Sequence, residues 1–265
     1  MNAESKIQSG GSFGQGFYFP RWGEYKNLFG VEVELKVFYK INWIFIVAFQ
    51  NLLELVQPRV NPDVLLVDTF FSELGWRDYA QNVILQFPDY GSRNGRPTLD
   101  TLPWRTGAAA AADLKAWQQG RTGYPIVDAG MRQLWATGWM HNRVRMITAS
   151  FLIKHLLIDW REGERWFWDC LVDADYGSNA VNWQWTAGTG IDANMFVRIM
   201  APLVQSPKFE AGDYIRQWVP ELAQVRGDAI HDPEEAGCRP AAYPPKIIGH
   251  RAAPERAPAA VKQAH

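Results

Sequence analysis

The sequence is poor in cysteine and has almost no net charge. Its 265 residues include two cysteines, Cys170 and Cys238, and 27 Lys and Arg against 28 Asp and Glu, a formal net charge of -1. Two cysteines cannot build the disulfide framework of a small secreted domain, and no signal peptide is recognisable, so we expect a protein of the reducing cytoplasm. The five histidines follow no metal-binding spacing such as HExxH, and we predict no metal site.

Long hydrophobic runs are also missing. The most apolar segment, residues 41–56, is interrupted by Asn42, Gln50, Asn51 and Glu54. A helix that spans a bilayer needs about 20 apolar residues, so we interpret this segment as a core helix and expect no membrane association. Because basic residues are not in excess, any contact with nucleic-acid phosphates must come from a local patch. The charge balance therefore neither supports nor excludes DNA binding.

Apolar residues and tryptophan are what the chain has in abundance. Hydrophobic residues make up 47% of it and tryptophan occurs 13 times, which indicates a soluble globular protein with one large domain or two small ones. Residues 1–16 are rich in Gly and Ser and are expected to be a disordered lead-in. Residues 31–37 alternate between apolar and charged side chains, which predicts a half-buried strand.

The most informative stretch covers residues 137–190. Apolar residues recur at intervals of three and four between Met140 and Trp160, which predicts one buried helical face along this length. Asn142, Arg145 and Met146 are three and four residues apart and would share one patch of the helix, whereas Arg143 would point away. Such a patch suits a ligand that is partly charged and partly flat. An ordinary amphipathic helix with solvated arginines explains the same spacing.

Two further pairs follow this helix. Of Asp173 and Asp175, one could form a bidentate contact with Arg145 while the other accepts hydrogen bonds from a ligand, or the pair could simply cap the next helix. Trp183 and Trp185 would project roughly 200° apart on a helix, so one could line a cavity while the other packs inside. Tryptophan pairs are also common in cores and interfaces.

Weaker patterns lie on either side of this stretch. Glu73, Trp76 and Arg77 would share one face of a helix, although Trp76 alone would equally suit a core aromatic. Residues 87–116 look like a loop because of their proline and glycine content. Residues 213–222 read as a final surface helix.

Three runs carry a family resemblance: GRTGYPIVDAGMRQL at 120–134, TGWMHNRVRMITASFLIKHLLIDWREGE at 137–164 and WQWTAGTG at 183–190. They resemble the photolyase/cryptochrome family, and most closely the helical flavin domain of bacterial class I cyclobutane pyrimidine dimer photolyases. The resemblance implies an all-α, multi-helical FAD-binding domain over residues 68–250. It leaves residues 1–67 as a divergent or rearranged, partly disordered segment and residues 251–265 as a disordered tail.

The first quarter of the chain departs from the family. Neither the amino-terminal α/β domain of antenna-binding type nor the Thr/Ser-rich loop that cradles the flavin pyrophosphate is evident there. We therefore interpret the chain as a truncated or rearranged member of the family.

By resemblance, the chain would bind FAD and DNA that contains pyrimidine dimers, and would split the dimers in light by electron transfer from reduced FAD. It would act as a monomer. The residues that the resemblance assigns to catalysis in the substrate cavity are Glu73, Trp76, Met146 and Trp185. Those of the electron-transfer chain, from the surface to the flavin, are Trp104, Trp160 and Trp183.

The same resemblance assigns the binding residues. FAD would contact Phe70, Arg77, Asn142, Arg145, Asp173, Asp175 and Asn179. DNA would contact Glu73, Trp76, Arg77, Asn142, Arg143, Trp185 and Gln205. In this scheme Asp173 holds Arg145, and Asn179 lies beside the reactive ring nitrogen of the flavin.

Two positions favour dimer repair over other branches of the family. Asn142 and Met146 stand where (6-4) photolyases have histidines that act as acid and base. A cryptochrome-like blue-light sensor or an inactive flavin-domain remnant is the main alternative. A helical fragment that binds no flavin is a third.

Overall fold

The computed structural model describes residues 65–193 and 199–249, and the side chains from Ser72 onward within these ranges. The strand expected at 31–37, the core helix expected at 41–56, the polar lead-in and the tail at 251–265 all lie outside the described residues. The chain divides into two units, Met1–Thr69 and Phe70–His265. The second unit holds the candidate site.

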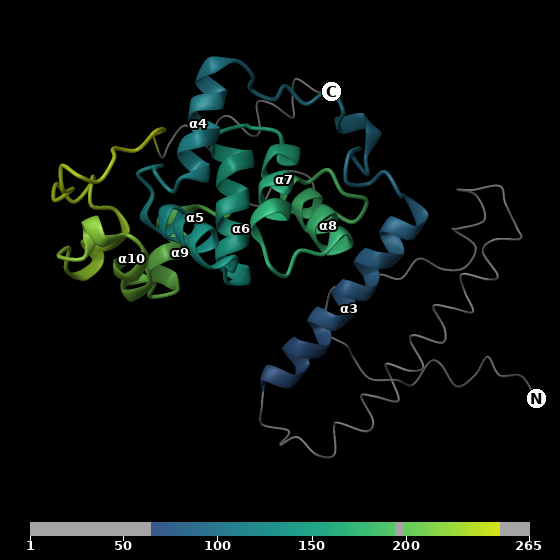
Figure 1. The fold of residues 1–265 in the computed structure, drawn as a ribbon, viewed down its shortest axis with the longest axis horizontal. Helices are drawn as coiled ribbons and strands as arrows, with labels where there is room; N and C mark the ends of the chain where they lie inside the picture. The colour runs from purple at the N-terminus through teal and green to yellow at the C-terminus, as the bar shows by residue number, and fades with distance from the viewer. Residues whose placement is uncertain (1–64, 194–198, 250–265) are drawn as a thin grey trace, which may run out of the picture. The chain divides into compact units, whose positions relative to one another are not determined.

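The described residues contain helices and no strand, so the predicted all-α fold is confirmed for them (Figure 1). The α-helices are α3 (Leu65–Gln86), α4 (Ala108–Gln118), α5 (Pro125–Thr137), α6 (Asn142–Ser150), α7 (Trp160–Cys170), α8 (Tyr176–Ala187), α9 (Pro202–Lys208) and α10 (Gly212–Trp218). A π-helix, η4 (Phe151–His155), follows α6, and the 3₁₀-helices are η3 (Pro97–Leu99), η5 (Pro220–Leu222) and η6 (Gly227–His231).

Helix α5 lies at the centre of the packing and has clear sequence signals at both ends. Pro125 occupies its first turn, where the missing backbone N–H costs nothing, and Gly138 ends it in the left-handed conformation with φ 69°. Between them the helix is buried on almost every side. Figure 1 shows α5 beside α6 and next to α9 and α10, and these helices are in contact.

A buried carboxylate ties the start of α5 to a distant part of the chain. Asp128 is fully buried and accepts hydrogen bonds from the backbone N–H and the hydroxyl of Thr122, at 2.7 and 2.6 Å. The phenol of Tyr243 donates a third bond, at 2.5 Å. Burial raises the pKa of Asp128, and these donors oppose that rise. The segment around Tyr243 is thereby fixed against the α4–α5 loop.

Helix α8 is shared by two apolar clusters. Trp183 and Ala187 belong to the main cluster, which also includes residues of α4, α5, α6 and α7. Ala180 and Val181 instead pack with Ala80 and the neighbouring apolar residues of α3. The polar residues of α8 between these two faces are left to line a cavity.

Three expectations about the helices need correction. The apolar face between Met140 and Trp160 is buried as expected, but it is not one helix. It is divided among α6, the π-helix η4 and the start of α7 at Trp160. Leu157, with a left-handed φ of 53°, separates η4 from α7. The expected loop at 87–116 ends earlier, since α4 begins at Ala108. The expected surface helix at 213–222 ends at Trp218 and continues as η5, and Ile215 and Leu222 are fully buried.

Candidate functional site

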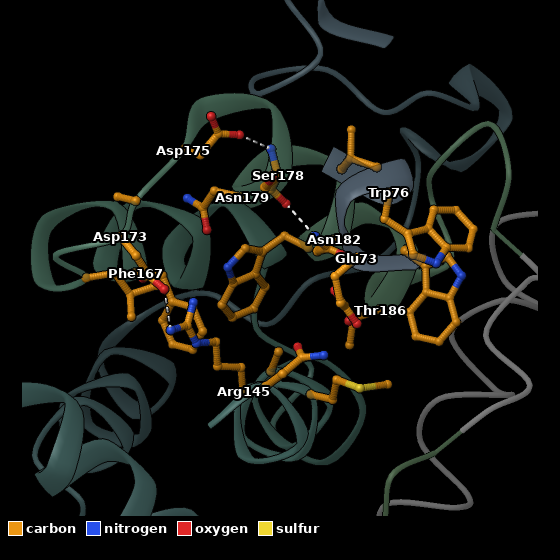
Figure 2. A pocket seen from close by; sticks show the side chains of 18 of the residues that line it. Glu73, Trp76, Arg145, Phe167, Asp173, Asp175, Ser178, Asn179, Asn182 and Thr186 are labelled. Carbon is orange, nitrogen blue, oxygen red and sulfur yellow. Dashed lines mark hydrogen bonds and ion pairs between the residues drawn. The ribbon is translucent and has the colours of Figure 1, made fainter. Parts of the chain in front are cut away.

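A cavity of about 300 Å³ lies between α3, α6, α7 and α8 (Figure 2). This volume is at the lower end of the range for small-molecule sites. Its polar lining residues are Glu73, Asn142, Arg145, Asp173, Asp175, Ser178, Asn179, Asn182, Thr186 and Asp192. Its apolar and aromatic lining residues are Trp76, Met146, Ala149, Phe167, Leu171, Ala174, Val181, Trp183 and Trp185.

Arg145 is held in place from two directions. Its Nη2 contacts Asp173 Oδ2 at 2.9 Å, and its Nε donates to the carbonyl of Met140 at 2.7 Å. The contact with Asp173 uses one nitrogen, so the expected bidentate geometry is wrong, although the pairing itself is present. Because the guanidinium is mostly buried and fixed, it presents a cation at a defined point of the pocket wall.

Asp175 combines a structural role with a position in the lining. Its Oδ1 accepts the backbone N–H of Ser178 at 2.8 Å, which caps the first turn of α8. The side-chain amide of Gln81 donates to both of its oxygens, at 2.8 and 2.9 Å. The capping alternative therefore holds for Asp175 and the arginine pairing for Asp173. Asp175 also links α3 to the start of α8.

Asn179 faces the pocket from α8 and is bonded to α7 behind it. Its Nδ2 donates to the Glu164 carbonyl oxygen at 3.0 Å and to Glu164 Oε1 at 2.8 Å. Glu164 is 8% exposed, and burial raises the pKa of its carboxyl group. The Asn179 bond opposes this rise because it favours the charged form.

An aromatic cluster forms one wall of the cavity. The Trp183 ring lies 5.0 Å from Phe167 and 6.3 Å from Trp117 between centroids, edge to face in both cases. Trp117 is fully buried and donates its indole N–H to the Thr148 carbonyl at 3.0 Å. Trp183 thus packs in the core, as one indole of the pair was expected to do, and Trp185 lines the cavity; Trp183 also lines the cavity, so the division between the two indoles is not complete.

The more open part of the lining carries larger exposed side chains. Trp76 is 42% exposed and meets Tyr79 edge to face at 5.8 Å. Glu73, one turn earlier on α3, is exposed, and Trp185 is half-buried. Figure 2 shows Trp76 at the end of the lining opposite Asp173. Two indoles and a carboxylate therefore stand on the accessible side of the cavity.

Not every residue singled out by sequence lies in this lining. Arg77 is exposed on α3, and Gln205 is half-buried on α9. Arg143 lies outside the lining, with its guanidinium 5.4 Å from the centroid of Phe209 and its Nη1 3.5 Å from the sulfur of Met146. The side chain of Phe70 lies outside the described part of the chain.

The tryptophans assigned to electron transfer differ in burial. Trp183 is 3% exposed and Trp160 is fully buried, with its indole N–H donated to Asn94 Oδ1 at 2.9 Å. Trp104 is half-buried and packs against the main cluster. Burial therefore decreases from the pocket wall and core towards Trp104.

Several lining residues were missed by the sequence reasoning. Ser178, Asn182 and Thr186 follow Asp175 along α8 at helical spacing, and this polar stripe was available as a signal. Asp192 follows α8, and partial desolvation raises the pKa of its exposed carboxyl group. Glu164, which holds Asn179, could not be found from spacing because the contact depends on how α7 packs on α8.

Comparisons with known proteins identify the family. Residues 70–263 match the family described as the FAD-binding domain of DNA photolyase, and the chain belongs to that family. The chain is 51% identical over 204 residues to the deoxyribodipyrimidine photo-lyase of Agrobacterium fabrum, covering 73% of this chain and 42% of that protein. It is 45% identical over 170 residues to Cryptochrome-1 of Sinapis alba, covering 64% and 33%.

A solved structure also matches. The chain superimposes on a bacterial class III photolyase from Agrobacterium tumefaciens with a TM-score of 0.72 and 47% identity, covering 79% of this chain and 44% of that one. The particular likeness to class I enzymes therefore stays a prediction. The chain spans about two fifths of the length of these photolyases.

FAD is the cofactor of this family, and the pocket residues fit a flavin ring. A fixed guanidinium, three amides and two hydroxyls lie beside the flat or apolar walls of Phe167, Leu171 and Trp183. A ring that is apolar on its faces and polar at its edges needs such a donor and acceptor set. Among the lining residues, Arg145 is the one cation.

No group of three or more His, Cys, Asp or Glu side chains among the described residues could hold a metal ion. In the same ranges no helix has both the length and the apolar character required to cross a bilayer.

Proposed function

We propose that the pocket holds the flavin ring of FAD and that the domain repairs cyclobutane pyrimidine dimers in DNA in light. One observation carries the proposal. The residues that resemble the flavin site and those that resemble the substrate site line the same cavity, with Arg145, Asp173 and Asn179 at one end and Glu73, Trp76 and Trp185 nearer the opening. Amino-acid side chains cannot perform light-driven one-electron chemistry, and bound FAD would supply it.

The deeper residues are suited to hold and tune an electron-rich ring. Arg145, fixed by Asp173 and the Met140 carbonyl, keeps a positive charge where it stabilises negative charge on the ligand. Asn179 offers a neutral oxygen to a ring N–H. Trp183 and Phe167 close the wall behind the ring and exclude water.

The outer residues are suited to bind the damaged bases. A dimer inside a duplex cannot be reached, so it must be extruded into a pocket, as is established for photolyases in general. Trp76 and Trp185 would stack on the extruded bases, and Glu73 would accept a hydrogen bond from a base N–H. Met146 would contact the cyclobutane ring that joins the two bases. Asn142, Arg77, Arg143 and Gln205 would position the DNA around the opening.

Reduction of a bound flavin would use Trp183, Trp160 and Trp104. Trp183 lies in the pocket wall, Trp160 in the core, and Trp104 is half-buried. Trp104 is the least buried of the three, which supports its place at the surface end of the proposed path.

The test combines a spectrum with a repair assay. Purified protein reconstituted with FAD should absorb in the blue and near ultraviolet with close to one FAD per chain, and light should remove thymine dimers from an oligonucleotide. Flavin without repair would favour the sensor alternative, which the likeness to Cryptochrome-1 of Sinapis alba supports. Absence of bound flavin would favour the third alternative, a helical fragment that binds no flavin.

Two variants separate the two ends of the cavity. Glu73→Ala and Trp185→Ala should reduce repair at least tenfold, an order-of-magnitude expectation for one lost transition-state contact, and leave the FAD content unchanged. If either releases the flavin, the assignment of these residues to the substrate end is wrong.

We further propose that the chain acts as a monomer in the cytoplasm. Cys170 and Cys238 are both free, as expected in a reducing compartment. Size-exclusion chromatography with light scattering should give a mass of 30.2 kDa. Twice this mass would show that the chain forms a dimer.

A further inference from the structure

Phe209 is an exposed aromatic residue in contact with two cations. It is the C-cap residue of α9 and is 46% exposed. The guanidinium carbon of Arg143 lies 5.4 Å from the centroid of its ring, and Nζ of Lys208 lies 5.7 Å from the same centroid. Arg143 belongs to α6 and Lys208 to α9, and these helices are in contact, so one ring gathers cations from two elements.

Neither cation has a carboxylate partner among the described residues. Arg145, two positions after Arg143, is held by Asp173, and several other arginines in those ranges form similar ion pairs. A further contact of Arg143 runs from its Nη1 to the sulfur of Met146 at 3.5 Å, and a thioether is a weak, uncharged acceptor. The described part of the chain therefore leaves the positive charges of Arg143 and Lys208 uncompensated.

The kind of contact decides how much charge is left for a ligand. A carboxylate that fixes a guanidinium also neutralises it, as Asp173 does for Arg145. An aromatic face attracts a cation through its quadrupole and adds no net charge. Phe209 thus restricts where the two cationic groups lie while their positive charges stay available to an anion.

The position and charge of this group select a phosphate backbone. Met146 lines the cavity and Arg143 does not, so the cations stand beside the pocket and can meet what extends beyond it. Basic side chains interleaved with an exposed aromatic ring are typical of nucleic-acid surfaces. A DNA strand repeats one negative charge per nucleotide, which two cations held a short distance apart match.

We propose that Phe209 is a positioning residue that holds Arg143 and Lys208 for two phosphates of the DNA beside the pocket. The inference rests on the proposed DNA binding and deepens it. The ring reduces the conformational freedom that two long side chains would otherwise lose on contact with the duplex. Phe209 thereby strengthens the contact with every sequence equally, because phosphates carry no information about the bases.

The experiment is a salt titration of the full chain with an undamaged duplex, which needs neither flavin nor light. Each phosphate contact contributes about 0.9 to the magnitude of the slope of log affinity against log salt. Phe209→Leu keeps an apolar side chain but loses the aromatic face, so this magnitude should fall by between about 1 and 2. Phe209→Tyr keeps the ring and should retain the wild-type slope.

Trp168→Leu is the matched control. Trp168 is also 46% exposed and lies outside the cavity lining, so this substitution removes the same kind of surface and should leave the slope unchanged. Because Phe209 is exposed, Phe209→Leu should keep a melting temperature close to that of the wild type. Thermal denaturation thus separates a change in the placement of the cations from a loss of the fold.

A triple variant tests whether the ring acts through the cations. In an Arg143→Ala/Lys208→Ala background, Phe209→Leu should change neither the slope nor the affinity, because the side chains that it positions are gone. A further loss of affinity in that background would show that the ring contacts the DNA directly. The same conclusion would follow from a loss of affinity in Phe209→Leu at an unchanged slope, and either result would overturn the positioning role.

The remaining outcomes separate this inference from the proposed function. Wild-type slope and affinity in Phe209→Leu would overturn the inference alone. Failure of the wild type to bind FAD or to repair dimers, with a slope that still depends on Phe209, would overturn the proposed repair and leave the inference standing. A wild-type chain that does not bind the duplex at about 50 mM salt would overturn the DNA binding on which the inference rests.

Discussion

Because Gly163 has no side chain, the ring of Trp183 can pack directly against α7. A Cβ placed there would overlap the six-membered ring of Trp183 and would lie 2.7 Å from Leu152 Cδ2. Gly163→Ala should therefore push the indole into the cavity, lower FAD affinity and destabilise the fold by about 1–3 kcal/mol. Thermal denaturation and FAD titration check both effects.

The matched control is another helical glycine. A Cβ at Gly75 in α3 would meet nothing within 4 Å. Gly75→Ala should raise stability slightly, by up to about 1 kcal/mol, because alanine is the better helix former. Equal effects of the two substitutions would show that crowding around Trp183 is not the cause.

The ion pair between Asp173 and Arg145 should contribute more to FAD binding than to the stability of the fold. Asp173 is about half exposed, so Asp173→Asn should change the free energy of unfolding by less than about 1 kcal/mol. FAD affinity should fall by about tenfold, because Arg145 loses the partner that aims it at the pocket. Asp213→Asn, which removes the exposed partner of Arg216, should leave FAD affinity unchanged. Retained affinity in Asp173→Asn would contradict the role given to the pair.

At this scale, spacing predicted some contacts and not others. Asn142, Arg145 and Met146 line the cavity and Arg143 does not, as intervals of three and four require. The Arg145 contact with Asp173 spans 28 positions; spacing leaves it as one of several options, and only the resemblance singles it out. The contact between Asn179 and Glu164 was not expected, because it depends on the side-by-side packing of α7 and α8.

Among the elements, the segment from α6 to α7 shows why periodicity is an incomplete guide. Phe151, Leu152 and His155 are buried as the spacing predicts, yet they lie in a π-helix. Burial alone does not separate the two kinds of helix, since apolar intervals of three to five suit both. The end of the segment did carry a signal: Asp159 caps α7, and Glu162 stands three residues later.

The π-helix holds a buried lysine whose titration should be visible in the stability of the protein. Lys154 is 1% exposed and donates to the carbonyl of Ala187, the last residue of α8, at 2.9 Å. Burial lowers the pKa of Lys154 in the folded chain to about 7, from 10.5. Between these values the unfolded chain binds a proton that the folded chain does not, so the free energy of unfolding rises with pH.

Lys154→Met should remove this dependence. Below pH 7 the variant should be more stable by up to about 3–5 kcal/mol, less about 1 kcal/mol for the lost hydrogen bond to Ala187. Urea denaturation at several pH values between about 6 and 10 measures the difference. Lys115→Met, at an exposed position of α4, is the control and should follow the wild type. Parallel curves for all three proteins would show that Lys154 keeps its ordinary proton affinity.

For the whole molecule, the all-α fold was predictable from resemblance and not from periodicity. Helical spacing identifies an amphipathic face but not its partner, so it could not predict that the phenol of Tyr243 reaches Asp128 or that Gln81 reaches Asp175. A family relationship carries such long-range contacts because relatives share the packing. It also explains why one cavity could be expected from residues as distant as Glu73 and Trp185.

The net charge of the molecule makes a further prediction about DNA. With a formal net charge of -1, the chain as a whole does not attract phosphates, so the proposed DNA binding would depend on a few cations near the pocket. Arg143 lies beside Met146 of the lining and beside Phe209, which is 46% exposed. If Arg143 contacts one phosphate, Arg143→Ala should reduce the slope of log affinity against log salt by about 1.

The measurement is a salt titration of binding to a duplex that contains one thymine dimer. The affinity of Arg143→Ala should fall equally for damaged and undamaged duplexes, because phosphate contacts carry no information about the bases. Arg93→Ala removes an arginine side chain that is 78% exposed and lies outside the lining, and it should leave the slope unchanged. An unchanged slope in Arg143→Ala would leave the phosphate contacts to other residues, and a loss of affinity confined to the damaged duplex would place Arg143 in dimer recognition.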